Sequence, residues 1–260
     1  MKDITLVEML KAGVHFGHQK SRWHPKMEPY IFTARNSIYI INLEKTREKL
    51  ITALDFVRDV ASRGGKILFV GAKRQAKSIV KKYADSVGMP FVVERWIGGT
   101  FTNYETIQKL IKNYKDLLSQ QEKGEFAKYK KKERLKIEEK IAKMKEAVGG
   151  ITSLESLPDA VFIVDLKQDR TAVREAKKRN IPIVGIADTN VSPEGIKYII
   201  PANDDATKSL EFITSLVAEA IAEGQAEKQK QTTVKAPEDS KDSASPEQND
   251  LAKKDKGDLK

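Results

Sequence analysis

Short apolar runs constrain the fold of this chain more than any other feature of the sequence. They are five to six residues long at most positions, and they span residues 66–70, 89–93, 160–164, 181–186 and 198–201. Helical patterns separate most of them. Strands that are apolar on both faces and alternate with helices indicate a parallel sheet covered on both sides. We therefore expect an α/β fold built on a doubly wound, mostly parallel sheet.

The segments around these runs carry start and stop signals for helices. Asn42 can cap a helix that begins at Leu43, and the Gly64-Gly65 pair ends it. The other expected helices cover residues 5–12, 73–87, 169–179 and 205–223. An irregular segment at 13–36 and a β-branched strand at 37–41 lie between the helix at 5–12 and the helix that begins at Leu43. An irregular segment of that length inside a domain is usually functional.

A pair of long helical patterns interrupts the alternation in the middle of the chain. Residues 103–119 place apolar side chains three and four apart, and a sparser stripe follows from Phe126 to Val148. The pattern predicts an antiparallel coiled-coil hairpin over 103–149 that projects from the rest. The globular domain is then discontinuous, from residues 1–102 and 150–224. Residues 225–260 have few large apolar side chains, which predicts a disordered charged tail.

Positive charge dominates the composition and lies in the first part of the chain. The sequence has 47 Lys and Arg residues against 37 Asp and Glu, a net charge of +10. Residues 1–150 carry 31 cations and 17 anions, whereas residues 151–225 carry 8 and 12. A basic surface of this kind favours polyanionic partners, chiefly nucleic acid. We expect such a partner to bind the first 150 residues.

Several classes of protein are disfavoured by what the composition omits. The chain has no cysteine, which excludes disulfides, thiolate metal sites and cysteine nucleophiles. Its first residues show no secretory signal, and no apolar run approaches the roughly 20 residues of a membrane span. We expect a soluble cytoplasmic protein.

Cations and aromatic side chains are interleaved in two predicted loops, which favours contact with RNA. One is the segment 13–36, and the other is the turn 95–103, where two glycines follow Trp96. Cations bind phosphates, and aromatic rings stack on unpaired bases. A predicted helix near 73–87 and the second hairpin helix add further basic residues. The candidate RNA-binding residues are His15, His18, Arg22, Trp23, Lys26, Arg35, Lys73, Arg74, Lys77, Lys81, Arg95, Trp96, Lys130, Lys131, Lys132 and Arg134.

Catalytic and nucleotide-binding alternatives have weaker support. The turn at Gly71 precedes Lys73 and Arg74, but it lacks both common glycine-rich phosphate-binding patterns. Asp165 and Asp188 follow strands, where catalytic carboxylates often lie. Neither has a histidine or cysteine near it in sequence, so we interpret both as turn-forming residues and predict no catalytic residue and no cofactor.

A metal site is the remaining alternative for the histidine-rich segment. His15 and His18 are three residues apart, and His24 follows. Glu28 is the only acidic residue close to them in sequence, and zinc would need a further ligand. The segment is also basic, which opposes cation binding. We therefore predict no metal.

A series of motifs lies along residues 3–223, in this order: Gly13–His18, Trp23–Met27, Tyr30–Phe32, Arg35-Asn36, Ile41–Thr46, Phe69–Ala76, Arg95–Thr100, Leu157–Ala160, Ala187–Asn190 and Ile200–Ala206. Together they resemble bacterial-type small-subunit ribosomal protein two (the S-two family). Single exchanges from the usual family pattern occur at His24, Asn42, Val191, Ser192 and Ala202.

The resemblance implies a flavodoxin-like domain with a protruding coiled-coil hairpin, and a structural rather than enzymatic role in the small ribosomal subunit. It implies binding to small-subunit ribosomal RNA and help in docking the large mRNA-binding ribosomal protein during translation. Other small-subunit proteins would be partners, without membrane or small-molecule substrate. The alternative from the residues themselves is an enzyme that uses a nucleotide or sugar phosphate on the same sheet.

Overall fold

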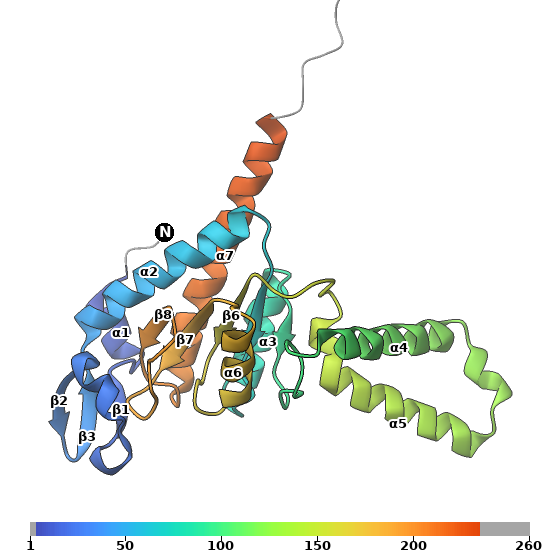
Figure 1. Cartoon of the computed structure of the whole chain (residues 1–260), viewed down its shortest axis with the longest axis horizontal. Coiled ribbons are helices and arrows are strands. Elements are labelled where there is room, and N and C mark those ends of the chain that lie inside the picture. Colours follow the sequence, from blue (N-terminus) through green and yellow to red (C-terminus); the bar gives the residue numbers. More distant parts are fainter. Residues whose placement is uncertain (1–3, 235–260) are drawn as a thin grey trace, which may run out of the picture.

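The central element is a sheet of five parallel strands, which confirms the predicted doubly wound, mostly parallel sheet. The computed structural model describes residues 4–234, and side chains within it up to residue 230. The strands lie in the order β5-β4-β6-β7-β8, all parallel to their neighbours (Figure 1). Their bounds are β4 Ile67–Val70, β5 Phe91–Val92, β6 Ala160–Ile163, β7 Ile183–Ala187 and β8 Tyr198–Pro201. The apolar runs therefore form the strands of one doubly wound sheet.

Helices cover both faces of this sheet because alternate strand residues point to opposite sides. Phe69 and Phe162 pack with three helices, α2 (Leu43–Ser62), α3 (Lys77–Ser86) and α7 (Thr207–Val234). Leu68 and Ile163 face the other side, where they pack with α6 (Arg170–Lys178) and with Trp96 and Phe101. The turn at 95–103 therefore belongs to the same layer as α6.

The first 41 residues contain more structure than the sequence predicted. After α1 (Leu6–Lys11), three short strands form an antiparallel sheet in the order β1-β3-β2. Asn36 and Ser37 connect β2 to β3 with positive φ angles of 48° and 61°, typical of a two-residue hairpin turn. Only the strand near 37–41 was expected. The added elements are β1 Phe16–Gln19, β2 Ile31–Arg35 and the 3-10 helices Lys20–Arg22 and Pro25–Tyr30, beside β3 Ile38–Ile41.

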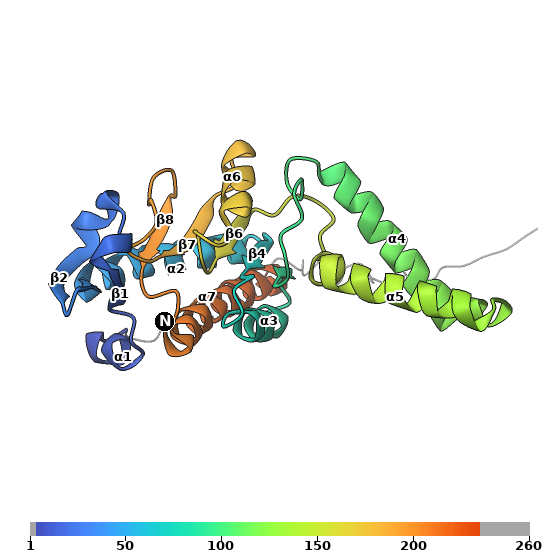
Figure 2. The same cartoon turned by 90° about the horizontal axis from the view of Figure 1, so that it is seen from below.

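Two helices extend sideways from the sheet in the middle of the chain (Figures 1 and 2). They are α4 (Tyr104–Glu122) and α5 (Lys131–Val148), joined through the 3-10 helix Glu125–Lys128. Their buried residues, which include Ile111 and Ile141, form a narrow apolar seam continuous with the α6 side of the core. The helices agree with the predicted hairpin, and the coiled-coil character of their packing stays a prediction.

The last helix is longer than expected. Helix α7 runs from Thr207 to Val234, past the predicted end at 223, and packs closely on α2. Residues 225–234 are therefore helical and not part of a disordered tail. The rest of the predicted tail, residues 235–260, lies outside the described residues. Within the described part of the chain, no helix is long and apolar enough to cross a membrane.

Candidate functional site

Lys73 sits in a buried network of charges at the carboxyl edge of the sheet. It follows β4, and its Nζ lies 3.0 Å from Asp165, 2.8 Å from Asp204 and 2.7 Å from Asp205. Burial lowers the pKa of Lys73, but its hydrogen bonds to Asp204 and Asp205 outweigh burial and raise the pKa overall. The ammonium is therefore compensated by carboxylates of the protein itself. An RNA contact through Lys73 stays a prediction, which these ion pairs do not support.

His18 joins the N-terminal sheet to the same edge. Its Nδ1 lies 3.0 Å from Asp188 Oδ1, and its Nε2 lies 2.8 Å from the amide nitrogen of Asn190 and 3.4 Å from Asp205 Oδ2. The His18 backbone N–H donates to Thr189 Oγ1 over 2.8 Å. The hydrogen bond to Asp188 raises the pKa of His18 against the effect of burial. His18 thus links the two sheets, and its RNA contact stays a prediction that these bonds do not support.

The carboxylates at this edge make the contacts of turn-forming residues. Asp165 accepts the backbone N–H groups of Lys167 and Gln168, and Asp188 accepts the backbone N–H of Thr189. These contacts agree with the structural interpretation of both aspartates. Burial, followed by repulsion from Asp165 and Asp188, raises the pKa of Asp204 to about 7.

The geometry of this edge also bears on the metal alternative. One oxygen from each of Asp188 and Asp204 and a nitrogen of His18 lie within 4.8 Å of one another. A nitrogen and two oxygens are a ligand set that a divalent cation accepts. The sequence-level alternative joined His18 to His15 and His24 instead. The structure describes no group of three candidate ligands that includes either of those two histidines.

The turn at 95–103 is organised around one buried carboxylate from α6. Glu175 accepts the indole N–H of Trp96 at 3.2 Å and the backbone N–H groups of Gly99 and Phe101 at 2.8 and 2.9 Å. Burial raises the pKa of Glu175, but these hydrogen bonds outweigh it and lower the pKa overall. Trp96 is only 8% exposed, so its ring is not available to stack on RNA. The burial of Trp96 does not support its predicted RNA contact, which stays a prediction, whereas Arg95 is exposed.

The remaining sequence-predicted cations divide into paired and unpaired residues. Lys26 forms an ion pair with Glu194, and Lys77 with Glu94. His15 and Trp23 are half-buried. The exposed candidates divide into single residues on separate elements, Arg22, Arg35, Arg74, Lys81 and Arg95, and one group at the start of α5, Lys130, Lys131, Lys132 and Arg134.

Sequence reasoning missed a second group of exposed cations on α6. Arg170, Arg174 and Lys178 are exposed and four residues apart. They were overlooked because residues 151–225 have a net negative charge. The helical spacing of the cations could have found them, since residues four apart share one face of a helix.

These observations define the class of protein: a doubly wound α/β domain that has a network of ion pairs at one edge of its sheet and exposed cations on its surface. Comparison with known families then identifies it further. The family described as Ribosomal protein S2 matches residues 9–224, and the chain belongs to this family. The protein is therefore a structural protein of the small ribosomal subunit.

Proposed function

We propose that this protein binds small-subunit ribosomal RNA through its exposed cations and has no catalytic role. The single observation that carries the proposal is the match to the Ribosomal protein S2 family over residues 9–224. The exposed and unpaired cations of the globular domain and of α5 support it. Each cation that neutralises a phosphate releases condensed counterions, so affinity should fall steeply with salt.

We propose that residues 103–149 form an inserted hairpin domain that extends the RNA contact beyond the globular domain, residues 1–102 and 150–224. Lys130, Lys131, Lys132 and Arg134 are exposed at the start of α5, the end away from the sheet (Figure 2). Lys128 and the ring of Tyr129 precede them, with the Nζ 5.6 Å from the ring centroid. Cations next to an aromatic ring suit a phosphate contact beside an unpaired base.

We propose further that the protein supports docking of the large mRNA-binding ribosomal protein on a bacterial-type ribosome in the cytoplasm. The N-terminal region supports a protein partner because it exposes several large apolar side chains. Val7 is 59% exposed, Leu10 54%, Phe16 49% and Phe32 72%. Exposed apolar side chains that gather in one region are typical of protein interaction sites.

Two measurements test the proposed function. The tagged protein, expressed in a bacterium, should sediment with the small subunit in a sucrose gradient. The purified protein should bind transcribed small-subunit ribosomal RNA saturably, with a dissociation constant that rises between 50 and 200 mM salt by roughly a thousandfold if about six phosphates are contacted. Sedimentation only at the top of the gradient, together with salt-insensitive RNA binding, would refute the proposal.

A further inference from the structure

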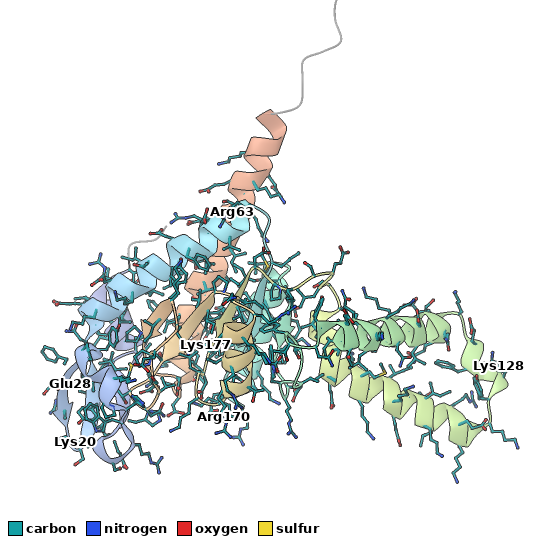
Figure 3. All side chains as sticks on the ribbon, in the orientation of Figure 1. Lys20, Glu28, Arg63, Lys128, Arg170 and Lys177 are labelled. Atoms are coloured by element: carbon teal, nitrogen blue, oxygen red, sulfur yellow. The ribbon has the colours of Figure 1, made fainter. Side chains whose placement is uncertain are left out.

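The charged side chains of α6 and the residues next to it are sorted by sign between the interior and the surface. Asp169 and Glu175 are buried, at 4% and 8% exposure. All the cations of this segment are exposed: Lys167, Arg170, Arg174, Lys177, Lys178 and Arg179. The surface of α6 is therefore cationic without acidic neighbours from its own segment, and Arg170 extends outward from the end of the helix in Figure 3.

Three of these cations form a stripe along one side of the helix. Arg170, Arg174 and Lys178 are four residues apart, which sets them about 6 Å from one another along the axis. Within residues 4–234, these three make no ion pair, whereas Lys177 donates to the backbone carbonyl of Glu194 over 2.5 Å. Like charges four apart on a helix repel each other. Arg170 also lies at the start of the helix, where the helix dipole disfavours a cation. A bound polyanion would relieve both costs.

Glu175 connects this stripe to Arg95. The buried carboxylate belongs to α6, and its hydrogen bonds hold Trp96, Gly99, Phe101 and Thr102 of the neighbouring turn. Arg95 and the first residues of α6 are therefore fixed relative to each other. A cavity of about 610 Å³ lies between them, and its lining includes Arg95, Gly98, Gln168, Asp169 and Thr171.

We propose that Arg95 and the stripe of Arg170, Arg174 and Lys178 form one surface that binds the phosphate backbone of RNA. This inference rests on the proposed function and assigns part of the RNA contact to a particular surface. Guanidinium groups bind phosphates and carboxylates alike with two hydrogen bonds in a fixed plane, so the composition of this face is what favours RNA over an acidic protein. The apolar residues of α6, Ala172, Val173 and Ala176, are all buried, so the face lacks the apolar centre of a protein interface.

A matched pair of double variants tests this surface. Arg170→Gln/Arg174→Gln removes two charges from the stripe. Arg63→Gln/Lys66→Gln removes two exposed charges from the opposite edge of the sheet, before β4 (Figure 3). Binding of each full-length protein to transcribed small-subunit ribosomal RNA is measured over a salt series. The slope of log K against log salt should become shallower by about 1.4 to 1.8 in the α6 double variant, because each lost phosphate contact removes 0.7 to 0.9 from its magnitude.

The controls separate this inference from its alternatives. The Arg63/Lys66 double variant should keep the wild-type slope, and Arg170→Lys/Arg174→Lys should keep most of it because the charges remain. The α6 variants should melt at the wild-type Tm, since their altered side chains are exposed and, within residues 4–234, unpaired. The control variant should lose only slightly in Tm, because Arg63 makes an exposed ion pair with Asp59. A wild-type slope in the α6 double variant would overturn the inference and leave an acidic protein as the partner of this face. An equal fall in both double variants would overturn it too, because only net charge would matter. If the wild-type protein does not bind the RNA, the proposed function itself fails.

Discussion

The indole Nε1 of Trp96 lies 3.2 Å from Oε1 of Glu175, a residue 79 positions further along the chain. This hydrogen bond commits the aromatic ring of the turn to the interior, where it packs edge-on against Phe101 at 4.9 Å between ring centroids. The same arrangement leaves Arg95 exposed. The turn therefore presents a charge to the solvent and keeps its large aromatic ring as an anchor.

Replacing Glu175 by Gln should destabilise the protein although the shape of the side chain is kept. The amide group of Gln would turn N–H donors toward the donors of Trp96 and Gly99 or toward those of Phe101 and Thr102, leaving buried N–H groups without acceptors. A loss of about 1–3 kcal/mol is expected from urea denaturation. Glu219→Gln, on an exposed part of α7, is the control and should stay within about 0.5 kcal/mol. Equal stabilities of the two variants would contradict this role of Glu175.

Asp169 should make the protein less stable as pH rises from about 4 to 6. Burial, and repulsion from Asp165, raise the pKa of Asp169 to about 6, against the opposing effect of the Ala72 N–H that it accepts. In that interval the folded state holds a proton that the unfolded state has already released, so stability falls as pH rises. Above pH 6 the full cost of about 2–3 kcal/mol applies.

Asp169→Asn tests this assignment because Asn keeps an oxygen for the Ala72 N–H but cannot ionise. Stability curves against pH should diverge, with the variant gaining on the wild-type protein between pH 4 and 6. Denaturation at half-unit steps of pH measures the difference. Parallel curves across this interval would show that Asp169 ionises normally in the folded state.

The same substitution should destabilise the protein at Lys73 and leave its stability almost unchanged at Arg74. Lys73→Met leaves Asp165, Asp204 and Asp205 without their shared cation, and breaking a buried ion pair from one side costs about 3–5 kcal/mol. Arg74 is exposed, so Arg74→Met should change stability by less than about 0.5 kcal/mol. Thermal and urea unfolding compare the two. The effects on RNA binding should have the opposite order. Among molecules that remain folded, only Arg74→Met should make the dependence of RNA affinity on salt shallower.

The contrast between these neighbours shows what the sequence could and could not predict. The parallel strands were predictable because a run such as Ala160–Val164 is apolar on both faces, which is a local property. The ion pairs of Lys73 could not be predicted, because its partners Asp204 and Asp205 lie 131 and 132 positions further along the chain. A local pattern of cations next to a turn cannot distinguish a phosphate contact from a buried ion pair.

Local sequence patterns also failed to predict β1 and the exposed cations of α6. The strand β1 was missed because its sequence, Phe16–Gln19, lacks alternation, and because its partners, β3 and Thr189, lie about 20 and 171 positions further on. The cations of α6 were missed because a sum over residues 151–225 cancels exposed cations against acids that turn out to be buried, Asp169 and Glu175 among them. Net charge predicts a binding face only where the acids and cations are equally exposed.

Gly17 should be essential for joining the N-terminal sheet to the main sheet. A Cβ at this position would lie 2.6 Å from Thr189 Cγ2 and 3.0 Å from the backbone oxygen of Tyr39, both too close for a normal contact. Gly17→Ala should therefore destabilise the protein by about 1–3 kcal/mol. Thr189→Ser removes the methyl group, the nearest clash, and keeps the hydroxyl, which accepts the His18 N–H and would itself lie 2.9 Å from the new Cβ. The double variant should recover part of the loss, and a double-mutant cycle from urea denaturation measures the coupling. Additive effects would show that the two sheets do not meet at this contact.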